Sequence, residues 1–270
     1  DYSSGSTGIN LTLLDSGATV NVSHNIGGVA SDSLTNIEGI KGSTTASNTL
    51  IGNNMNNTLI GGNQTDTIKG VSGNNSLSGG AGNDTIFAGT GSDTIDGGAG
   101  NDDWLYYTDL ASTNVSVNLR NNTATYGSST DSITAIEHLK MGNGTNTVQG
   151  NSYANSFIGG TGTDTLSYSE AASGVTVNVT SAGAGTSSGD GADVFTGFEN
   201  YTLSGNADII NLDVVHNGSI IDGGTGIDTA SYANVATALT VTVANGNTSA
   251  TVSDGTNSNT LQSIEKIIGG

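Results

Sequence analysis

Apolar and polar residues alternate in four stretches of this chain, which begin at Thr19, Val115, Val175 and Leu239. The stretches read TVNV, VSVNL, VTVNV and LTVTV. A period of two places successive side chains on opposite faces of an extended backbone. The pattern therefore predicts a strand in each of the four stretches.

A nine-residue unit repeats seven times without a gap from Ser43 to Leu105, as STTASNTLI, GNNMNNTLI, GGNQTDTIK, GVSGNNSLS, GGAGNDTIF, AGTGSDTID and GGAGNDDWL. Position six of every unit is Asn or Asp, namely Asn48, Asn57, Asp66, Asn75, Asp84, Asp93 and Asp102. Position eight is always large and apolar, namely Leu50, Leu59, Ile68, Leu77, Ile86, Ile95 and Trp104. The nonapeptide returns in residues 141–167, at Leu203 and, after slightly irregular spacing, at Gly223.

The two halves of the nonapeptide predict different local structures. Its glycine-rich first half disfavours a helix, because each Gly costs roughly 1 kcal/mol there relative to Ala, but Gly permits the positive φ of tight turns. Its second half predicts a three-residue strand with the apolar residue facing inward. Two nonapeptides then form one 18-residue turn of a flattened coil, which must be stacked to be stable. We predict an all-β, elongated parallel β-solenoid, or β-roll, with interspersed strand modules.

A longer repeat separates the nonapeptide blocks. It opens with a tyrosine four residues after the last aspartate of a block, at Tyr106, Tyr168 and Tyr232, with Tyr2 as a first member. The alternating stretch, a Gly/Ser/Thr-rich loop and a run with a glutamate follow; the runs are DSLTNIEGI, DSITAIEHL, DVFTGFENY and NTLQSIEKI. We expect the tyrosines to pack where modules meet. The glutamates Glu38, Glu137, Glu199 and Glu265 could cap turns or bond backbone amides, which we favour, or ligate further ions.

These repeats divide the chain into seven expected segments. Strand modules are expected at residues 1–42, 106–140, 168–202 and 232–270. Nonapeptide blocks are expected at residues 43–105, 141–167 and 203–231. The sequence leaves open whether the modules continue the nonapeptide coil or form separate small sandwiches.

Composition points to a repeated cation site. The chain has 42 glycines, no proline or cysteine, and 24 acidic against 5 basic residues, for a net charge of −19. A disordered acidic tail or halophilic solvation would not place carboxylates at a fixed spacing beside regularly spaced apolar residues. The negative electrostatic field of this charge makes nucleic acid and anionic membranes poor partners. No stretch approaches the ~18 apolar residues of a membrane span. Because the chain starts without Met and ends within the repeat pattern, we expect a segment of a longer protein.

The units GGAGNDTIF, GGTGTDTLS and GGTGIDTAS resemble the GGxGxDxUx nonapeptide of the RTX family, the calcium-binding repeats of type I-secreted bacterial proteins. The resemblance implies calcium as the cofactor, export unfolded and folding outside the cell. The chemistry agrees, because Ca²⁺ takes six to eight oxygen ligands and a glycine-rich loop with an aspartate offers carbonyl and carboxylate oxygens.

An 18-residue turn places alternate nonapeptides on the same edge of the coil. Asn48, Asp66, Asp84 and Asp102 would stack on one edge and Asn57, Asn75 and Asp93 on the other. We expect the best sites between Asp66 and Asp84 and between Asp84 and Asp102, and a weaker one between Asn75 and Asp93. At Asn48, Asn57, Asn146 and Asn155, stacked side-chain amides are expected in place of calcium. The candidate metal ligands are Asp66, Asn75, Gly79, Gly80, Gly82, Asp84, Gly91, Asp93, Gly97, Gly98, Gly100, Asp102, Asp164, Asp208 and Asp228.

The chain carries no HExxH, GK[ST] phosphate loop or GxSxG motif, and we expect it not to be an enzyme. The expected function is a calcium-binding structural repeat region of a large extracellular bacterial protein, of adhesin-stalk or surface-layer type. The alternative is the calcium-folding secretion segment of an exported toxin or hydrolase whose catalytic domain lies elsewhere. Its expected partners are calcium ions and neighbouring copies or cell-surface material.

Overall fold

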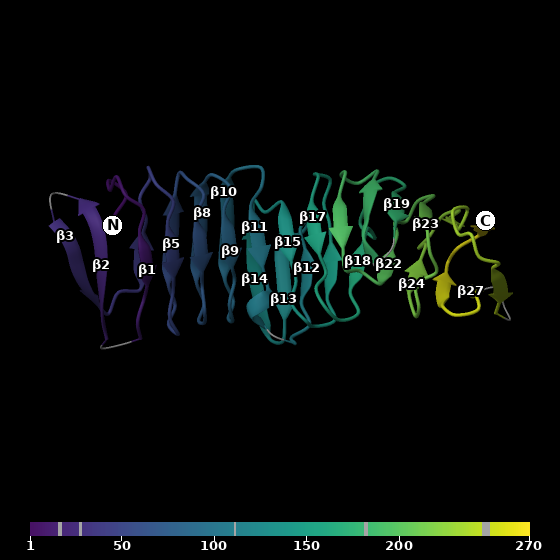
Figure 1. Ribbon diagram of the computed structural model, residues 1–270, viewed down its shortest axis with the longest axis horizontal. Coiled ribbons are helices and arrows are strands. Elements are labelled where there is room, and N and C mark those ends of the chain that lie inside the picture. The colour runs from purple at the N-terminus through teal and green to yellow at the C-terminus, as the bar shows by residue number, and fades with distance from the viewer. Residues whose placement is uncertain (16–17, 27–28, 111, 181–182, 245–248) are drawn as a thin grey trace. The chain divides into compact units, whose positions relative to one another are not determined.

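The computed structural model describes residues 1–15, 18–26, 29–110, 112–180, 183–244 and 249–270 (Figure 1). The chain is all-β, and its regular elements within these residues are strands together with a short 3₁₀ helix, η1 (Thr108–Leu110). No helix among these residues has the length and apolar character needed to cross a membrane. The chain forms two compact units, one of Asp1–Thr113 and Asn121–Gly142, the other of Asn114–Arg120 and Asn143–Gly270.

In the first unit, mostly parallel strands stack into two sheets. One has the order β1 (Asn10–Thr12), β5 (Thr49–Ile51), β7 (Thr67–Lys69), β9 (Thr85–Phe87), β11 (Trp104–Tyr106) and β15 (His138–Lys140). The other has the order β4 (Gly39–Lys41), β6 (Thr58–Gly62), β8 (Ser76–Ala81), β10 (Thr94–Ala99), β14 (Ser129–Thr134) and β13 (Thr123–Tyr126). A separate antiparallel pair is formed by β2 (Thr19–Ile26) and β3 (Val29–Thr35).

Alternate nonapeptides supply the two sheets, as the 18-residue turn predicts. In one sheet Thr67 pairs with Thr85, and in the other Leu59 pairs with Leu77. Both pairs are parallel and lie eighteen residues apart. The parallel β-solenoid predicted from the nonapeptide spacing is therefore confirmed.

The core of the first unit is a double row of aliphatic side chains, one from each nonapeptide strand. Its members, each no more than 1% exposed, are Leu50, Leu59, Ile68, Leu77, Ile86, Ile95 and Leu105. Burying each such side chain contributes about 1.5–3 kcal/mol, and a single coil would expose most of its own row. Stacked coils are therefore the unit of stability.

The second unit repeats this arrangement. One sheet has the order β17 (Ser156–Ile158), β21 (Val194–Thr196), β20 (Gly185–Ser188), β19 (Thr176–Val179), β23 (Ile209–Leu212), β25 (Thr229–Ser231) and β29 (Lys266–Ile268). The other has the order β12 (Ser116–Asn118), β16 (Thr147–Gln149), β18 (Thr165–Ser167), β22 (Asn200–Thr202), β24 (Ile220–Asp222), β28 (Ser258–Gln262), β27 (Ser249–Ser253) and β26 (Thr240–Val243).

The longer repeats continue the coil rather than form separate sandwiches. The run from Asp131 supplies β14, which pairs in parallel with β10, and β15, which pairs in parallel with β11. The run from Asp193 does the same through β21 with β17 and β22 with β18. The intervening alternating and loop segments add antiparallel strands, such as β13 beside β14 and β20 between β19 and β21. All four alternating stretches form strands, namely β2, β12, β19 and β26.

The tyrosine that opens the longer repeat in the first unit is Tyr107, and the assignment of Tyr106 was wrong. Tyr107 is fully buried, as are Tyr168 and Tyr232, whereas Tyr106 is half-buried. The hydroxyls of Tyr107 and Tyr168 each donate a 2.9 Å hydrogen bond to the first residue of the following run, Asp131 and Asp193 respectively. Each tyrosine therefore ties the end of a nonapeptide block to the coil that follows it.

Candidate calcium-binding columns

The position-six residues of one edge form a hydrogen-bonded column. The backbone N–H of Asn48 donates to Oδ1 of Asp66 at 2.5 Å, and that of Asp66 donates to Oδ1 of Asp84 at 2.7 Å. The N–H of Asp84 donates in turn to Oδ1 of Asp103 at 2.7 Å. Each position-six side chain thus reaches back by one coil, and the column follows the edge predicted from the sequence except at its last member.

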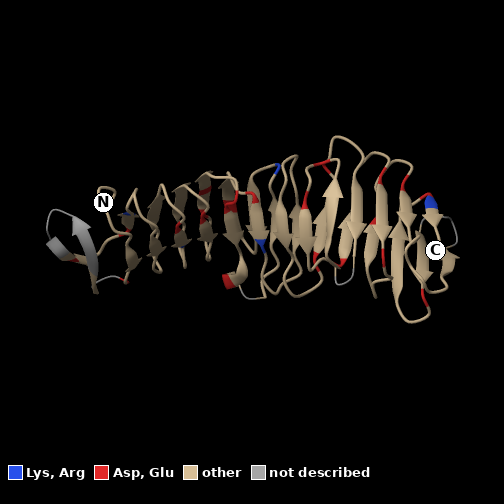
Figure 2. Cartoon of the chain, turned by 45° about the horizontal axis from the view of Figure 1, so that its top comes forward, with Lys and Arg blue, Asp and Glu red and all other residues tan. Residues whose placement is uncertain are grey.

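The opposite edge carries a second column. The backbone N–H of Asn57 donates to Oδ1 of Asn75 at 2.9 Å, and that of Asn75 donates to Oδ1 of Asp93 at 2.6 Å. The N–H of Asp93 donates to Oδ1 of Asp131 at 2.8 Å. The predicted division of the nonapeptides between two edges is confirmed by both columns. Figure 2 shows in red how acidic residues recur along the coils.

Asp103, and not Asp102, closes the first column, which corrects the sequence alignment by one residue. Leu105 rather than Trp104 fills the inward position, because Leu105 pairs with Ile86 and is fully buried. The last loop therefore holds one extra residue, and the half-buried Trp104 packs on His138 with ring centroids 4.9 Å apart. Asp102 is exposed and accepts a 2.8 Å contact from Nε2 of His138. The double aspartate concealed this shift, since either residue satisfies the repeat.

Six carboxylates in these columns and in the second unit each have one buried oxygen without a hydrogen-bond partner. The atoms are Oδ2 of Asp66, Asp84, Asp93, Asp103, Asp164 and Asp228, and every one of these residues is at most 2% exposed. Burying an unpartnered charged oxygen is costly, and such atoms are expected to be paired or to coordinate a metal. Repetition of the same buried oxygen in six loops is the arrangement expected of a repeated cation site.

Glycine keeps space open beside these oxygens. A methyl group added at Gly79 would overlap both Oδ2 of Asp84 and the carbonyl oxygen of Gly97 on the next coil. A methyl at Gly61 would overlap Oδ2 of Asp66 and the carbonyl oxygen of Gly79 in the same way. In each of these two loops, a carboxylate oxygen and a backbone carbonyl oxygen therefore lie around the same small space beside the glycine.

The remaining predicted glycines lie in the same loops. Gly80 and Gly98 pair across β8 and β10 with φ of 109° and 104°, a conformation that L side chains rarely adopt. Gly82 lies in the Asp84 loop with positive φ, and Gly100 lies beside Oδ2 of Asp103 at 2.9 Å from an added Cβ. In the Asp93 loop the carbonyl of Gly91 already accepts a 2.7 Å hydrogen bond from the hydroxyl of Tyr126, which weakens that loop as a cation site.

Where position six is asparagine, the side-chain amide occupies the corresponding place. Nδ2 of Asn48 donates to the carbonyls of Ser43 and Ala46, both at 3.0 Å. Nδ2 of Asn75 donates to the carbonyls of Ser72 and Gly73, so this residue needs no metal although it was a predicted ligand. Nδ2 of Asn146 donates to Gly144 at 3.0 Å and to Gly159 of the next coil at 3.2 Å. At Asn48 and Asn146 the side-chain amides thus hold the loops through backbone carbonyls, and the expected absence of calcium there stays a prediction.

The hydrogen bonds of the asparagine amide show where a cation would lie when aspartate stands at the same position of the repeat. Nδ2 of Asn146 donates to a carbonyl of its own loop, to the first-position carbonyl of the next coil and, at 2.9 Å, to Oδ1 of Asp164. An aspartate in that place has no hydrogen to offer, so its oxygen and the same carbonyls would face one another and create a negative potential between them. A hard divalent cation with oxygen ligands, Ca²⁺, suits that set of donors.

The isolated blocks of the second unit differ among themselves. Oδ1 of Asp164 accepts the N–H of Asn146 at 2.8 Å, and Oδ1 of Asp228 accepts that of Asp208 at 2.8 Å, while both Oδ2 atoms are unpartnered. Asp208, also a predicted ligand, is satisfied without metal, because its oxygens accept from the N–H and hydroxyl of Ser204 at 2.8–3.0 Å.

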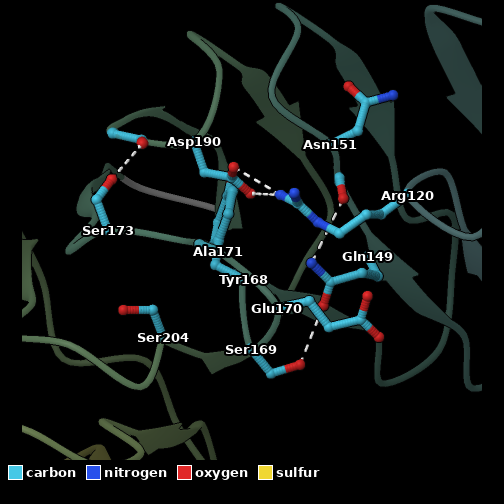
Figure 3. Close-up of polar contacts among 12 residues, drawn as sticks. Arg120, Gln149, Asn151, Tyr168, Ser169, Glu170, Ala171, Ser173, Asp190 and Ser204 are labelled. Atoms are coloured by element: carbon cyan, nitrogen blue, oxygen red, sulfur yellow. Dashed lines mark hydrogen bonds and ion pairs between the residues drawn. The ribbon is translucent and has the colours of Figure 1, made fainter.

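Another buried acid of the second unit, Asp190, is neutralised by a cation of the chain itself. Both carboxylate oxygens of Asp190 contact one guanidinium nitrogen of Arg120, at 2.5 and 2.6 Å (Figure 3). The Asp190 side chain is only 4% exposed. This pair shows that a buried carboxylate of the fold can be neutralised by a cationic side chain, so Asp190 needs no metal.

Burial shapes the protonation of the column aspartates. The pKa of Asp84 is raised to about 7, mainly by burial and also by the neighbouring carboxylates of Asp66 and Asp103, against the opposing hydrogen bond from the Asp66 N–H. Burial likewise raises the pKa of Asp93 to about 7 and that of Asp164 to about 6. A bound cation would reverse this by favouring the ionised carboxylates.

Backbone carbonyls must complete each site. Within the described residues, no three His, Cys, Asp or Glu side chains gather in one place. A Ca²⁺ ion would therefore combine one or two carboxylates with loop carbonyls, which the glycine-rich turns expose.

Comparison with known proteins agrees with this geometry. A family model described as the RTX calcium-binding nonapeptide repeat matches residues 43–77, 69–103 and 142–170. No curated protein sequence matches the chain significantly. Among solved structures, the extracellular lipase LipA of Serratia marcescens aligns at 16% identity and a TM-score of 0.19 over 83% of this chain, which spans 40% of the lipase chain. The chain carries hemolysin-type RTX calcium-binding nonapeptide repeats in several copies.

Proposed function

We propose that this chain is a calcium-folded structural segment of a large extracellular bacterial protein, of adhesin-stalk or surface-layer type. The observation that carries the proposal is the set of buried, unpartnered Oδ2 atoms in aspartates that are stacked coil upon coil. An ion bound at Asp84, for example, would link the loop of one coil to the Gly97 carbonyl of the next. Calcium would thus join successive coils along the nonapeptide block.

Metal binding and folding are coupled in this proposal. Asp66, Asp84 and Asp103 place one buried carboxylate on each of three successive coils, where neighbouring carboxylates repel one another without a counter-ion. The binding site exists only when the coils are stacked, so the free energy of calcium binding becomes free energy of folding.

The setting in the proposal follows from this coupling. RTX proteins are typically secreted, and extracellular calcium-binding modules work at about 10⁻⁴–10⁻³ M calcium. The segment would stay loose in a calcium-poor cytosol and stack outside the cell. Its role is that of a spacer, with neighbouring copies or cell-surface material as its partners and with no catalytic step assigned to it.

The test is a calcium titration of the metal-stripped chain, followed by far-UV circular dichroism. We expect a cooperative gain of β-signal with Ca²⁺ at up to millimolar concentration, which Mg²⁺ at the same concentration does not produce and a chelator reverses. A chain that is fully β-folded in chelator and unchanged by Ca²⁺ would contradict the proposal, and the asparagine-type amide bonds would then account for the whole fold.

A further inference from the structure

The glutamate of each longer repeat occupies the place of the next aspartate in a column. The N–H of Asp103 donates to Oε2 of Glu137 at 3.0 Å, that of Asp164 to Glu199 at 2.8 Å and that of Asp228 to Glu265 at 2.8 Å. Each of these three glutamates therefore bonds a backbone amide, which was one of the two roles considered from the sequence. The same bond runs between consecutive aspartates inside the nonapeptide block.

The return bonds are also the same in the three places. The N–H groups of Glu137 and His138 both donate to the carbonyl of Asp103, at 3.2 and 3.0 Å. Glu199 and Asn200 donate to the carbonyl of Asp164 at 3.1 and 2.9 Å, and Glu265 and Lys266 to that of Asp228 at 3.2 and 3.0 Å. Three segments of different sequence therefore build one local structure.

A backbone carbonyl is aimed into each of these places by a left-handed residue. Ala135, Gly197 and Ser263 stand two residues before the respective glutamates, with φ of 50°, 75° and 51°. A methyl group added at Gly97, Gly159 or Gly223 would overlap the carbonyl oxygen of Ala135, Gly197 or Ser263, respectively. Each of these carbonyls therefore occupies the position, relative to its aspartate loop, that the carbonyl of Gly97 occupies relative to the Asp84 loop.

The facing aspartate oxygen is buried and lacks a partner in all three places. Oδ2 of Asp103, Asp164 and Asp228 has no hydrogen bond, and each residue is 0% exposed. At Gly223 the geometry is most direct, because an added Cβ would lie 2.8 Å from Oδ2 of Asp228 and would overlap the carbonyl oxygen of Ser263.

We propose that each longer repeat completes a calcium site at the end of the preceding nonapeptide block. The sites combine Asp103 with Glu137 and the Ala135 carbonyl, Asp164 with Glu199 and the Gly197 carbonyl, and Asp228 with Glu265 and the Ser263 carbonyl. The glutamate run thus caps the calcium column, because it supplies the carboxylate and the backbone carbonyl that another nonapeptide would otherwise provide. This inference rests on the calcium binding proposed above and extends it to the strand modules.

The experiment counts bound calcium in the full chain by equilibrium dialysis and elemental analysis. The variants are Glu137→Gln, Glu199→Gln, Glu265→Gln and the triple variant, with Glu170→Gln as the control. Glutamine keeps an oxygen that accepts the aspartate N–H but removes the charge. Glu170 is exposed and lies outside the columns, and its carboxylate accepts a 3.0 Å hydrogen bond from Nδ2 of Asn118.

We expect each single variant to lose one ion, or to bind that ion about tenfold or more weakly, and the triple variant to lose three. Glu170→Gln should bind as many ions as the unchanged chain. Melting temperature gives a second measurement, because each single variant should melt lower in calcium but not in chelator. A purely structural glutamate would lower both melting temperatures equally, so that result, or an unchanged ion count, would overturn the inference. An unchanged chain that binds no calcium at all would instead refute the function proposed above.

Discussion

The backbone N–H of Asp84 donates a 2.7 Å hydrogen bond to Oδ1 of Asp103, one coil further along the solenoid. The other oxygen of Asp103 is buried and unpartnered. The neighbouring Asp102 points outward, with a side chain that is 54% exposed, and contacts His138. Two adjacent aspartates therefore have different chemistry, although the repeat pattern alone accommodates either one.

Replacing each of these two aspartates by asparagine separates their roles. Asp103→Asn should lower the number of bound calcium ions, because it removes a buried ligand charge. Asp102→Asn should leave the ion count unchanged and alter stability by less than about 0.5 kcal/mol, as an exposed substitution does. Calcium binding by isothermal titration calorimetry checks both; equal losses in the two variants would show that the register is not as the structure has it.

Asp84→Asn should have opposite effects in calcium and in chelator. The introduced amide can donate to the loop carbonyls as Asn48 does, which removes a buried unpartnered oxygen and raises metal-free stability by about 1–3 kcal/mol at pH 8. In calcium the same change removes a ligand and should lower stability. Urea unfolding under both conditions is the measurement, with the exposed Asp96→Asn as the control. A loss of stability in chelator would contradict the substitution argument.

The metal-free chain should become more stable on mild acidification. Asp84 and Asp93 have an ordinary pKa of 3.8 that burial raises to about 7 in the fold. The folded chain thus binds more protons than the unfolded chain, so this contribution is complete below about pH 4 and is lost as the pH rises through 7. Calcium requires the ionised carboxylates, so its apparent affinity should fall over the same interval as the pH decreases. Thermal melting in chelator between pH 4.5 and 8 tests the first statement, and stability that rises with pH would refute it.

Tyr107→Phe should destabilise the first unit by about 1.5–3 kcal/mol, because the lost hydroxyl donates to the buried carboxylate of Asp131. Asp131 would retain only the 3.2 Å bond from Tyr126 and its backbone contact. The adjacent Tyr106→Phe is the matched control and should cost less than about 0.5 kcal/mol. Denaturant unfolding in saturating calcium compares the two variants; a larger cost at Tyr106 would restore the original assignment of the repeat.

Val71→Gly should stabilise the chain by about 0.5–1 kcal/mol. Val71 has φ of 72°, a left-handed conformation that is strained for a β-branched residue. Relief of this strain should outweigh the larger conformational entropy that glycine loses on folding. Gly89 occupies the equivalent position on the next coil. The opposite substitution there, Gly89→Val, would place a Cβ 2.5 Å from the Val71 carbonyl oxygen and should destabilise the chain. Melting curves of both variants decide the matter, and a lower melting temperature for Val71→Gly would show that the Val71 side chain contributes more by packing than it costs in strain.

The sequence by itself determined the coil. A nine-residue period with an inward apolar residue and a polar loop favours one packing, in which two units make one turn. The parallel sheets, the two edges and every nonapeptide member of the columns except Asp103 therefore followed from spacing. The asparagine loops were also predictable, because an amide carries the hydrogens that a carboxylate lacks.

Only the tertiary structure decided the register at Asp102 and Asp103, the use of Tyr107, and the part played by the glutamate runs. In the last nonapeptide, Trp104 and Leu105 are both apolar, and the choice between them depends on which side chain fits between Ile86 and Leu139. The glutamates lie 34–37 residues beyond the aspartates they contact. A contact across such a separation depends on how the intervening strands fold back onto the coil, and local spacing carries no information about that.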